Sequence, residues 1–417
     1  MLGDQVFGNN DIINLPRNTY AECVKYIVDE CDAVSRILPV RQLDQDFGRA
    51  TRGACLALKS RVLLTAASPL FNGGGIVKSG AIASVIAYPT YDANRWATAA
   101  EAALDVINMG QYSLVVDNTT TPGLGFYRAF LTRLSPEIIF EFTQPLNRDF
   151  EGQFNPPSRS GGFYTQPTQG LVDAYDMING KPITDATSGY DPANPYARRD
   201  PRLRYTVTWN GSSYTTNANV QAPVYTYLNA PTDGLGIATT TGYYARKMCD
   251  TTISFGNGAL SERGYALIRY AETLLNYAEA INETGQTETA VSAINQLRSR
   301  AGIQAGTNGR YGIPVGITQD AMRTLIQKER RTEMAFEDTR FYDERRWKIA
   351  EAIENGFNTI MSITPKVPGR ITTLGTDYNY AIQNSVRKHV FFPANYLMPI
   401  PQTEVLKIPL MLQNPGY

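Results

Sequence analysis

Four long segments with helical periodicity follow one another in the second half of the chain, and they restrict the fold more than any other feature. They are separated by short turns at Gly285 and Asp338 and by one loop at residues 302–314. Helices of this length joined by short connections pack as antiparallel hairpins, and consecutive hairpins are typical of arrays similar to tetratricopeptide repeats. The four segments are residues 264–283, 287–301, 318–337 and 340–354.

An earlier helical block lies near the start of the chain. One helix is expected over residues 20–38, where Pro39 ends it, and a second over residues 49–67. A third lies between Asp92, which can cap it, and Gly110, which can end it. The fold is therefore predicted to be mostly α, with tetratricopeptide-repeat-like helical hairpins.

Between the two blocks the helical periodicity fades. The region is rich in Gly, Pro, Asn, Thr and Tyr, and it contains a short strand candidate at residues 204–209. Long loops inside a folded protein are usually functional, and the aromatic content argues against disorder. The tail is also loop-like, with a strand candidate at residues 387–392. We predict a helical scaffold at residues 15–110 and 262–360, and a loop-rich ligand-binding subdomain with short strands at residues 111–261 and 361–417.

Composition excludes several functional classes. Lys plus Arg and Asp plus Glu both number 39 in this chain of 417 residues, so no net field attracts nucleic acid or an anionic membrane. The 25 tyrosines supply many rings with a polar end, which suits a hydrated binding surface. No run of 18 apolar residues is present, and the first residues do not have the pattern of an export signal.

Metal and nucleophile chemistry have few candidate residues. The cysteines Cys23, Cys31, Cys55 and Cys249 show no Cys-x-x-Cys spacing, and His389 is the single histidine. A common zinc cluster therefore lacks ligands, and the cysteines are expected to be free thiols. His389 lies in a strand-like segment and is expected to be a packed or surface side chain rather than a catalytic base. No cofactor or metal is predicted.

The stretch "RYAETLLNYAEAINETG" (269–285) carries Tyr-Ala-Glu twice. Its apolar stripe has Ala271 and Ala278 at the centre, which allows close helix packing, and Glu272 and Glu279 at one border. Seven residues separate the two carboxylates by about 10.5 Å of helix rise, which is too far for a glycosidase pair. They are expected to pair with arginines in residues 326–351. Those arginines are Arg330, Arg331, Arg340, Arg345 and Arg346, which should also neutralise Glu329, Glu333 and Glu337.

Several stretches, in this order along the chain, resemble the SusD/RagB family of outer-membrane nutrient-binding lipoproteins. The clearest are "LIRYAETLLNYAEAINETG" (267–285), "AINQLRSRAGI" (293–303), "ERRTEMAFEDTRFYDERRW" (329–347) and "YLMPIPQTEVLKIPLMLQNPGY" (396–417). The resemblance implies a SusD-like α-α superhelix that carries a loop-rich subdomain.

The resemblance also implies a location and a partner. Family members sit on the outer face of Gram-negative bacteria through a lipid on an N-terminal cysteine. They cap a SusC-like TonB-dependent transporter, capture glycans or in some branches peptides, and are not usually enzymes. The family segment with the signal peptide, the lipidated cysteine and the first helices looks absent from this chain.

Sugars bind by laying an apolar face on an aromatic ring while amides and carboxylates contact the hydroxyl groups. The family segment shortly before the Arg-Tyr-Ala-Glu helix often contributes such contacts. The predicted ligand-binding residues there are Trp209, Asn210, Tyr214, Tyr225, Tyr227, Tyr243 and Tyr244. By contrast, Trp96 and Trp347 lie on helix faces and are predicted to be core residues.

Two alternatives to a glycan-binding protein remain at this point. One is a glycoside hydrolase whose carboxylates lie in the loops, with Asp173, Asp176, Asp191 and Asp200 as candidates. The other is a tetratricopeptide-type scaffold that binds peptides in its concave face.

Overall fold

The computed structural model describes residues 6–8, 11, 13–42 and 44–417. Its helical scaffold joins two groups of helices that are far apart in sequence. The first group is α1 (Tyr20–Ser35), α2 (Arg52–Ala67), α3 (Ala81–Ile86) and α4 (Asn94–Asn108). The second is α9 (Tyr270–Glu283), α10 (Thr287–Arg300), α11 (Gln319–Glu333), α12 (Arg340–Arg346) and α13 (Ala350–Ile353).

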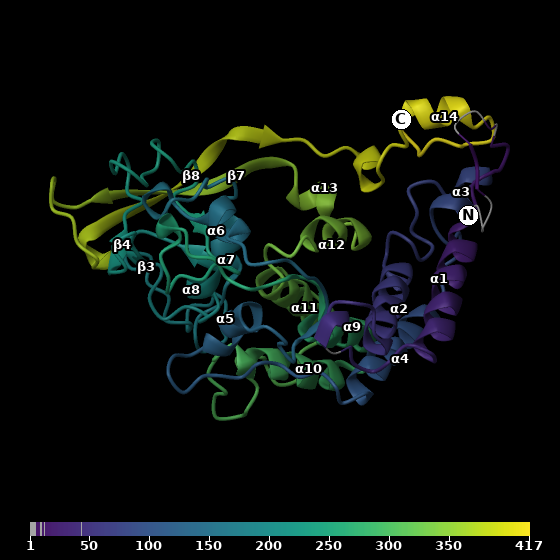
Figure 1. The fold of residues 1–417 in the computed structure, drawn as a ribbon, viewed down its shortest axis with the longest axis horizontal. Helices are drawn as coiled ribbons and strands as arrows, with labels where there is room; N and C mark the ends of the chain where they lie inside the picture. Colours follow the sequence, from purple (N-terminus) through teal and green to yellow (C-terminus); the bar gives the residue numbers. More distant parts are fainter. Residues whose placement is uncertain (1–5, 9–10, 12, 43) are drawn as a thin grey trace.

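The scaffold helices form a row in which each packs against the next. Helix α1 lies against α2, α2 against α4, α4 against α9, and α9 against both α10 and α11. Figure 1 shows the row running from α1 on the right to α10 at the bottom centre. No helix of the described residues is long and apolar enough to cross a lipid bilayer. The predicted mostly α fold with helical hairpins is confirmed.

Side-chain caps explain where several helices begin. The Thr19 side chain accepts a hydrogen bond from the Glu22 backbone at 3.2 Å, and the Glu22 carboxylate accepts one from the Thr19 backbone at 2.8 Å. This reciprocal capping box satisfies amide groups that have no partner within the first turn of α1. Thr51 and Thr318 cap α2 and α11 in the same way, each through one hydrogen bond.

Two predicted helices differ from the structure. Residues 265–269 form a strand, β6 (Tyr265–Arg269), because their backbone groups pair with β1 (Ile138–Phe142) before α9 begins. The predicted helix over residues 340–354 is divided into α12 and α13, since Lys348 between them adopts a left-handed φ of 58°. A residue in that conformation cannot continue a right-handed helix.

The loop-rich subdomain contains short helices and paired strands. Its elements before β6 are α5 (Leu124–Leu131), β1, α6 (Asp149–Phe154), α7 (Gln169–Ala174), α8 (Leu203–Thr206), β2 (Val207–Thr208), β3 (Ser212–Thr215), β4 (Gln221–Val224) and β5 (Tyr244–Ala245). Those after the scaffold are β7 (Gly356–Pro365), β8 (Tyr378–His389) and α14 (Gln402–Lys407). Within the described residues the strands form four antiparallel pairs, namely β1–β6, β2–β5, β3–β4 and β7–β8.

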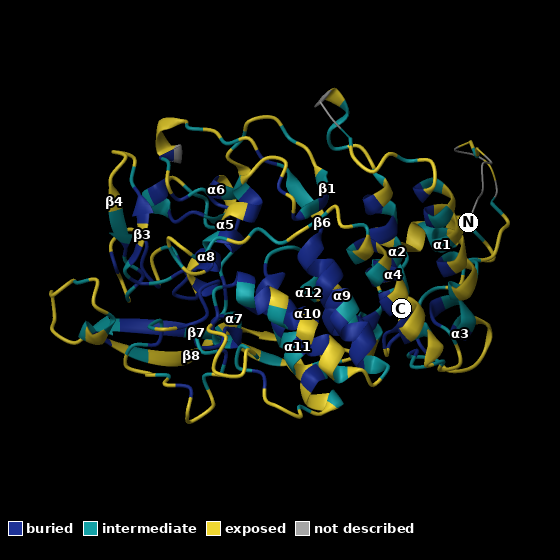
Figure 2. Cartoon of the chain, turned by 90° about the horizontal axis from the view of Figure 1, so that it is seen from below, coloured by how far each residue is buried: buried dark blue, intermediate teal, exposed yellow. Residues whose placement is uncertain are grey.

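The sequence analysis did not predict the β7–β8 hairpin and gave only a strand candidate at its end. Its pairing runs from Gly356 opposite His389 to Pro365 opposite Tyr378, so the strand begins inside the stretch assigned to the scaffold. The strand candidate at residues 387–392 covers only the end of β8, and the candidate at residues 204–209 is divided between α8 and the two-residue strand β2. Most of β8 is exposed, as Figure 2 shows, so it lacks the alternation that marks a half-buried strand.

The main core lies between the scaffold helices. Ala271, Leu275 and Ala278 on α9 are completely buried, and these small side chains let neighbouring helices come close. Figure 2 shows α9 as mostly buried. Trp96 and Trp347 are both 6% exposed, which confirms them as core residues. A second core fills the subdomain and includes Tyr175, Tyr243, Tyr378, Val207 and Ile363.

Buried ion pairs connect the subdomain to the scaffold, and we call this set the seam network. Arg202 near α8 pairs with Asp200 at 2.7 Å, Glu329 at 2.6 Å and Glu333 at 2.9 Å, and its side chain is 1% exposed. Arg269 pairs with Glu137, Glu333 and Glu337, again completely inside the protein. The remaining members are Arg298, Arg300, Lys247 and Asp176.

The seam network corrects part of the sequence-based pairing. Glu329, Glu333 and Glu337 are neutralised by cations from other elements, and not by the arginines of their own segment. For Glu272 and Glu279 on α9, the predicted arginine pairing is correct for one and incomplete for the other. Arg346 contacts Glu279 at 2.5 and 2.7 Å, as expected. Arg61 on α2 is the main partner of Glu272, at 2.8 and 2.7 Å, and was not predicted.

Candidate ligand-binding site

A tight turn after β2 presents Trp209. The Ser212 backbone amide donates to the Trp209 carbonyl at 2.9 Å, and the Ser212 hydroxyl accepts a hydrogen bond from the Trp209 amide at 2.9 Å. Gly211 in this turn has a φ of 89°, which favours glycine. The short β2–β5 ladder before the turn fixes its position, so the indole is held on a rigid base.

The Trp209 indole stacks on Tyr196. The ring centroids are 5.1 Å apart and the planes are inclined by 19°. Tyr196 also meets Tyr380 edge to face at 5.8 Å and Tyr243 at 6.2 Å. Trp209, Tyr196 and Tyr380 are partly buried, so each keeps some ring surface accessible to solvent. Offset and edge-to-face contacts of this kind stabilise an aromatic cluster beyond the area that it buries.

Two further tyrosines lie on the loop beside this stack. The side-chain oxygen Oδ1 of Asn210 accepts hydrogen bonds from the backbone amides of Thr226 at 2.9 Å and Tyr227 at 3.1 Å. Tyr227 stacks on Tyr378 with centroids 6.4 Å apart, and Tyr225 lies 6.1 Å from Tyr227. Asn210 is buried and holds the loop, whereas Tyr225 and Tyr227 are partly exposed. We use the name aromatic patch for Trp209, Tyr196, Tyr225, Tyr227 and Tyr380.

Three predicted ligand residues lie in the interior of the subdomain instead. Tyr214 is 1% exposed, and Tyr243 and Tyr244 are 0% exposed, so none offers a ring face to a sugar. The Tyr244 hydroxyl donates to the Asp233 carbonyl at 2.9 Å, and burial raises the pKa of Tyr244. The guanidinium of Arg246 lies 4.7 Å from the Tyr214 ring centroid. These three rings pack the subdomain, because β3 and β5 carry them towards its centre.

The sequence analysis did not identify Tyr196 and Tyr380. The Tyr380 hydroxyl donates to the Gly375 carbonyl at 3.0 Å, which holds the loop before β8 against the aromatic patch. A Cβ atom on Gly375 would lie 2.4 Å from the side-chain oxygen Oδ1 of Asn194, so a larger residue there would require the Asn194 side chain to move. The ring contacts of Tyr196 and Tyr380 join segments that are far apart in sequence, so no local sequence pattern predicts them. The Tyr-x-Tyr spacing at the start of β8 was the one available signal.

The loop carboxylates do not assemble a hydrolytic site. Asp176 pairs with Arg298 at 3.1 Å, and Asp200 pairs with Arg202, both in the interior. The Asp173 carboxylate accepts a hydrogen bond from the Gln169 amide at 2.7 Å. Asp191 is exposed and accepts from the backbone of its own turn. In the described residues, no group of three or more His, Cys, Asp or Glu side chains is arranged to hold a metal ion.

A cavity of about 610 Å³ lies on the scaffold side, between α2, β6, α12 and the segment around Met398. Phe341 and Tyr342 on α12 are 41% and 68% exposed and line it together with Leu267. The Tyr265 hydroxyl donates to the Asp338 carboxylate at 2.6 Å at its edge. Its size and lining are those of a site for a small molecule or a peptide side chain.

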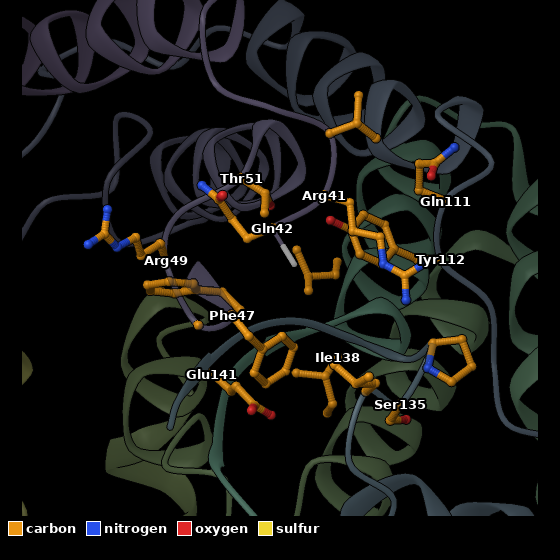
Figure 3. Close-up of a pocket in the computed structure, with 16 residues that line it drawn as sticks. Arg41, Gln42, Phe47, Arg49, Thr51, Gln111, Tyr112, Ser135, Ile138 and Glu141 are labelled. Atoms are coloured by element: carbon orange, nitrogen blue, oxygen red, sulfur yellow. The ribbon is translucent and has the colours of Figure 1, made fainter. Parts of the chain in front are cut away.

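Figure 3 shows a smaller cavity of about 210 Å³ between the segment at residues 40–51 and the strand β1. Phe47 and Tyr112 lie on two of its sides, and Glu141 and Ile138 lie on the β1 side. Burial raises the pKa of Glu141. None of the predicted ligand-binding residues lines this cavity.

These features define an α-helical repeat protein that carries a loop-rich subdomain with a partly exposed aromatic patch. The chain belongs to the SusD family, whose model matches residues 136–417. The family predicted from the sequence motifs is thus confirmed.

Individual relatives agree with the family. SusD-like protein P2 of Formosa agariphila is 30% identical over 229 residues, which are 52% of this chain and 40% of that protein. The chain is therefore similar to less than half the length of that curated relative. A solved SusD-like protein of Bacteroides fragilis is 26% identical with a TM-score of 0.76, covering 99% of this chain and 74% of that one. A SusD-like carbohydrate binding protein of the same organism, 22% identical with a TM-score of 0.73, covers 98% and 74% and shows the shared fold.

Proposed function

We propose that the protein is a non-catalytic glycan-binding protein and that the aromatic patch is its binding surface. The observation that carries this proposal is the Trp209 indole, held on Tyr196 by a stacked contact with part of its surface accessible. A flat ring in this position suits the apolar face of a sugar, and the nearby Tyr225 and Tyr227 hydroxyls can contact its hydroxyl groups.

The chemistry of the surrounding carboxylates supports binding rather than hydrolysis. A glycosidase needs two carboxyl groups about 5 Å or about 6.5 to 9.5 Å apart on either side of the sugar. The candidate carboxylates Asp176 and Asp200 are instead occupied by arginines in the interior. A sugar on the aromatic patch would therefore be held without an acid and base in place to cleave it.

The proposal includes a place of action. A SusD-like protein of this kind would hold the glycan on the outward face of the outer membrane, through a lipid anchor, and deliver it to a SusC-like TonB-dependent transporter. The family match supports this part, and the solved relative described as a carbohydrate binding protein supports only the choice of a glycan as ligand. We also propose that residues 111–261 and 361–417 form the ligand-binding part and residues 15–110 and 262–360 the scaffold, with β7 extending the former to Gly356.

Affinity electrophoresis in gels that contain individual polysaccharides tests the proposal. We expect the protein to be retarded by at least one glycan, and Trp209→Ala to remove the retardation without loss of folding. Tyr91→Ala is the matched control, because Tyr91 is an aromatic side chain that is 60% exposed on the scaffold. Release of reducing sugar that disappears when a single loop carboxylate is replaced would overturn the proposal in favour of a hydrolase.

A second candidate function, peptide binding by the scaffold, is favoured by the cavity of about 610 Å³ beside α12. Its exposed aromatic side chains could hold apolar peptide residues. Fluorescence anisotropy with a library of labelled peptides would detect this activity. Binding that Tyr342→Ala removes and Trp209→Ala leaves unchanged would support the second function over the first.

A further inference from the structure

Arg331 on α11 has a guanidinium group that contacts no carboxylate in the described part of the chain, although Glu344 and Glu354 act on it electrostatically. It makes no hydrogen bond, and no carboxylate oxygen lies within 4.0 Å of its nitrogens. Its neighbours differ sharply, since Arg330 pairs with Asp343 at 2.8 Å and Glu329 pairs with Arg298 at 2.9 Å. Arg331 is nevertheless only partly exposed. Burial and the nearby cation of Arg340 lower the pKa of Arg331.

The unpaired guanidinium faces a hollow of about 350 Å³ between α7, α11 and the start of α12. Lys328 and Arg340 line the hollow as well, so three cations meet there. Lys328 also contacts Asp176, and Arg340 contacts Glu344 through Nε. On the opposite wall Gly170 has no side chain, and a Cβ atom there would lie 3.5 Å from an Nη atom of Arg331. The guanidinium therefore lies close to the backbone of α7.

Acidic groups also act on these cations, since Asp173 lines the hollow and Glu344 and Glu354 oppose the lowering of the Arg331 pKa. The Asp173 carboxylate is engaged by Gln169, and burial raises the pKa of Asp173. Burial and the neighbouring Glu354 raise the pKa of Glu344 to about 7, although the Arg340 cation opposes this shift. Asp176, deeper in the seam, is shared between Arg298 and Lys328.

A partly buried guanidinium without a hydrogen-bonded partner is unfavourable, because it has lost water and the neighbouring carboxylates of Glu344 and Glu354 make no hydrogen bond to it. A guanidinium fork is best satisfied by two oxygens of one planar or tetrahedral anion, which bind it bidentately. We propose that the hollow between α7, α11 and α12 binds a carboxylate or sulfate group, with Arg331 as the principal donor and Arg340 and Lys328 as supporting cations.

Hydrogen bonds connect the wall of this hollow to the aromatic patch. The Tyr196 and Tyr243 hydroxyls are 3.1 Å apart, and the Tyr243 hydroxyl donates to the Gln169 carbonyl oxygen at 2.6 Å. The Gln169 amide in turn donates to Asp173. Because Tyr243 donates to Gln169, Tyr196 donates to Tyr243, and the whole chain of hydrogen bonds ends on the carboxylate. A glycan on the aromatic patch would make an acidic saccharide the source of the anion, and that part of the inference rests on the proposed function.

Isothermal titration calorimetry at constant ionic strength tests the inference with sodium glucuronate, sodium sulfate and glucose. We expect glucuronate or sulfate to bind the wild type, glucose to bind at least about tenfold more weakly in the hollow, and Arg331→Gln to lower the affinity for the anion by about tenfold or more. The matched control is Arg387→Gln, which removes the same charge from an exposed position on β8. It should leave anion binding unchanged.

The possible results separate the alternatives. Binding of both anions identifies the shared carboxylate and sulfate chemistry, glucuronate alone identifies the saccharide as the source, and sulfate alone identifies a free oxyanion. Absence of anion binding to the wild type, or equal binding by Arg331→Gln, overturns the inference. Thermal unfolding with and without sulfate checks that Arg331→Gln is folded, and the sulfate-dependent rise in Tm should be smaller in this variant than in Arg387→Gln. Retention of the variant by a neutral glycan gel tests the proposed function separately.

Discussion

The helical scaffold and the loop-rich subdomain are stabilised by different kinds of contact. The scaffold interior consists of small and aliphatic side chains such as Ala271 and Ala278, which set helix spacing. The subdomain interior combines aliphatic side chains with several buried tyrosines, of which Tyr243 bonds through its hydroxyl to Tyr196 and to the Gln169 side chain. The seam network between them uses charge. The comparison teaches that close helix packing determines the scaffold, whereas hydrogen bonds and ring contacts orient the aromatic side chains of the subdomain. Each region should therefore be sensitive to a different kind of substitution.

The largest effect is expected at the seam network. Arg269→Ala leaves Glu137, Glu333 and Glu337 without a shared counter-charge in the interior, which should lower the free energy of unfolding by about 3 to 5 kcal/mol. Urea denaturation followed by circular dichroism measures this loss. Arg387→Ala, at an exposed position, should change the value by less than about 0.5 kcal/mol. Equal losses in both variants would show that the seam does not join the two regions.

Acid should weaken the seam before it affects the scaffold interior. Burial alone would raise the pKa of Glu333, but the cations of Arg300 and Arg269 lower it well below its ordinary 4.5. A lowered folded-state pKa contributes stability that is complete above about pH 4.5 and is lost as the pH falls, by about 1.4 kcal/mol for each unit of the shift. Denaturation between pH 7 and pH 3 should show this decline, and Glu333→Gln should flatten it. An unchanged slope in the variant would contradict the assignment.

A smaller effect tests the close packing of the scaffold. Ala278→Val adds two methyl groups where α9 is completely buried, and it should cost about 1 to 3 kcal/mol through overpacking. Glycan retention should be unaffected, because the aromatic patch lies on the other region. The matched change Ala97→Val, on an exposed position of α4, should cost about 0.5 kcal/mol from helix propensity alone. Chemical denaturation of both variants decides whether burial is the cause.

The smallest effect sharpens the role of the tyrosine hydroxyls. Tyr196→Phe keeps the ring beneath Trp209 but removes the hydroxyl that bonds to Tyr243, at a cost of about 1 kcal/mol in stability. Glycan retention should persist, because stacking of the indole depends on the ring. Loss of retention at full folding would mean that the hydroxyl itself positions the ligand.

Sequence reasoning predicted the scaffold best, for a physical reason. The 3.6-residue periodicity is local, so helices such as α10 were located to within one residue. The sequence analysis extended helix α9 over residues 265–269, because β6 runs directly into α9 and the pairing of β6 with β1 is not visible in the local sequence. The β7–β8 hairpin was missed for a similar reason, since its second strand is exposed and lacks alternation.

The sequence identified the segment that carries the aromatic residues, but it did not predict which of their side chains are exposed and which are buried. Trp209 followed by Asn-Gly signalled a turn, and in the structure Trp209 and Gly211 of that turn are partly exposed whereas Asn210 is buried. Nothing local distinguishes Tyr227, which is partly exposed, from Tyr244, which is completely buried, because the outcome depends on strands paired across long stretches of chain. Tyr196 joins the patch through a stacked contact with Trp209, and that contact depends on the fold of the whole subdomain.

The multiple pairing within the seam network limits how the chain can drift under mutation. Arg269 has three acidic partners and Glu333 has three basic ones, so replacing either residue alone strands several charges at once. A substitution in the seam network therefore keeps the stability of the fold only if its ion-pair partners are replaced as well. The partly exposed aromatic residues of the loops carry no charge that a substitution would leave unpaired. Single substitutions in the loops can therefore change which ligand is bound while the seam network stays unchanged.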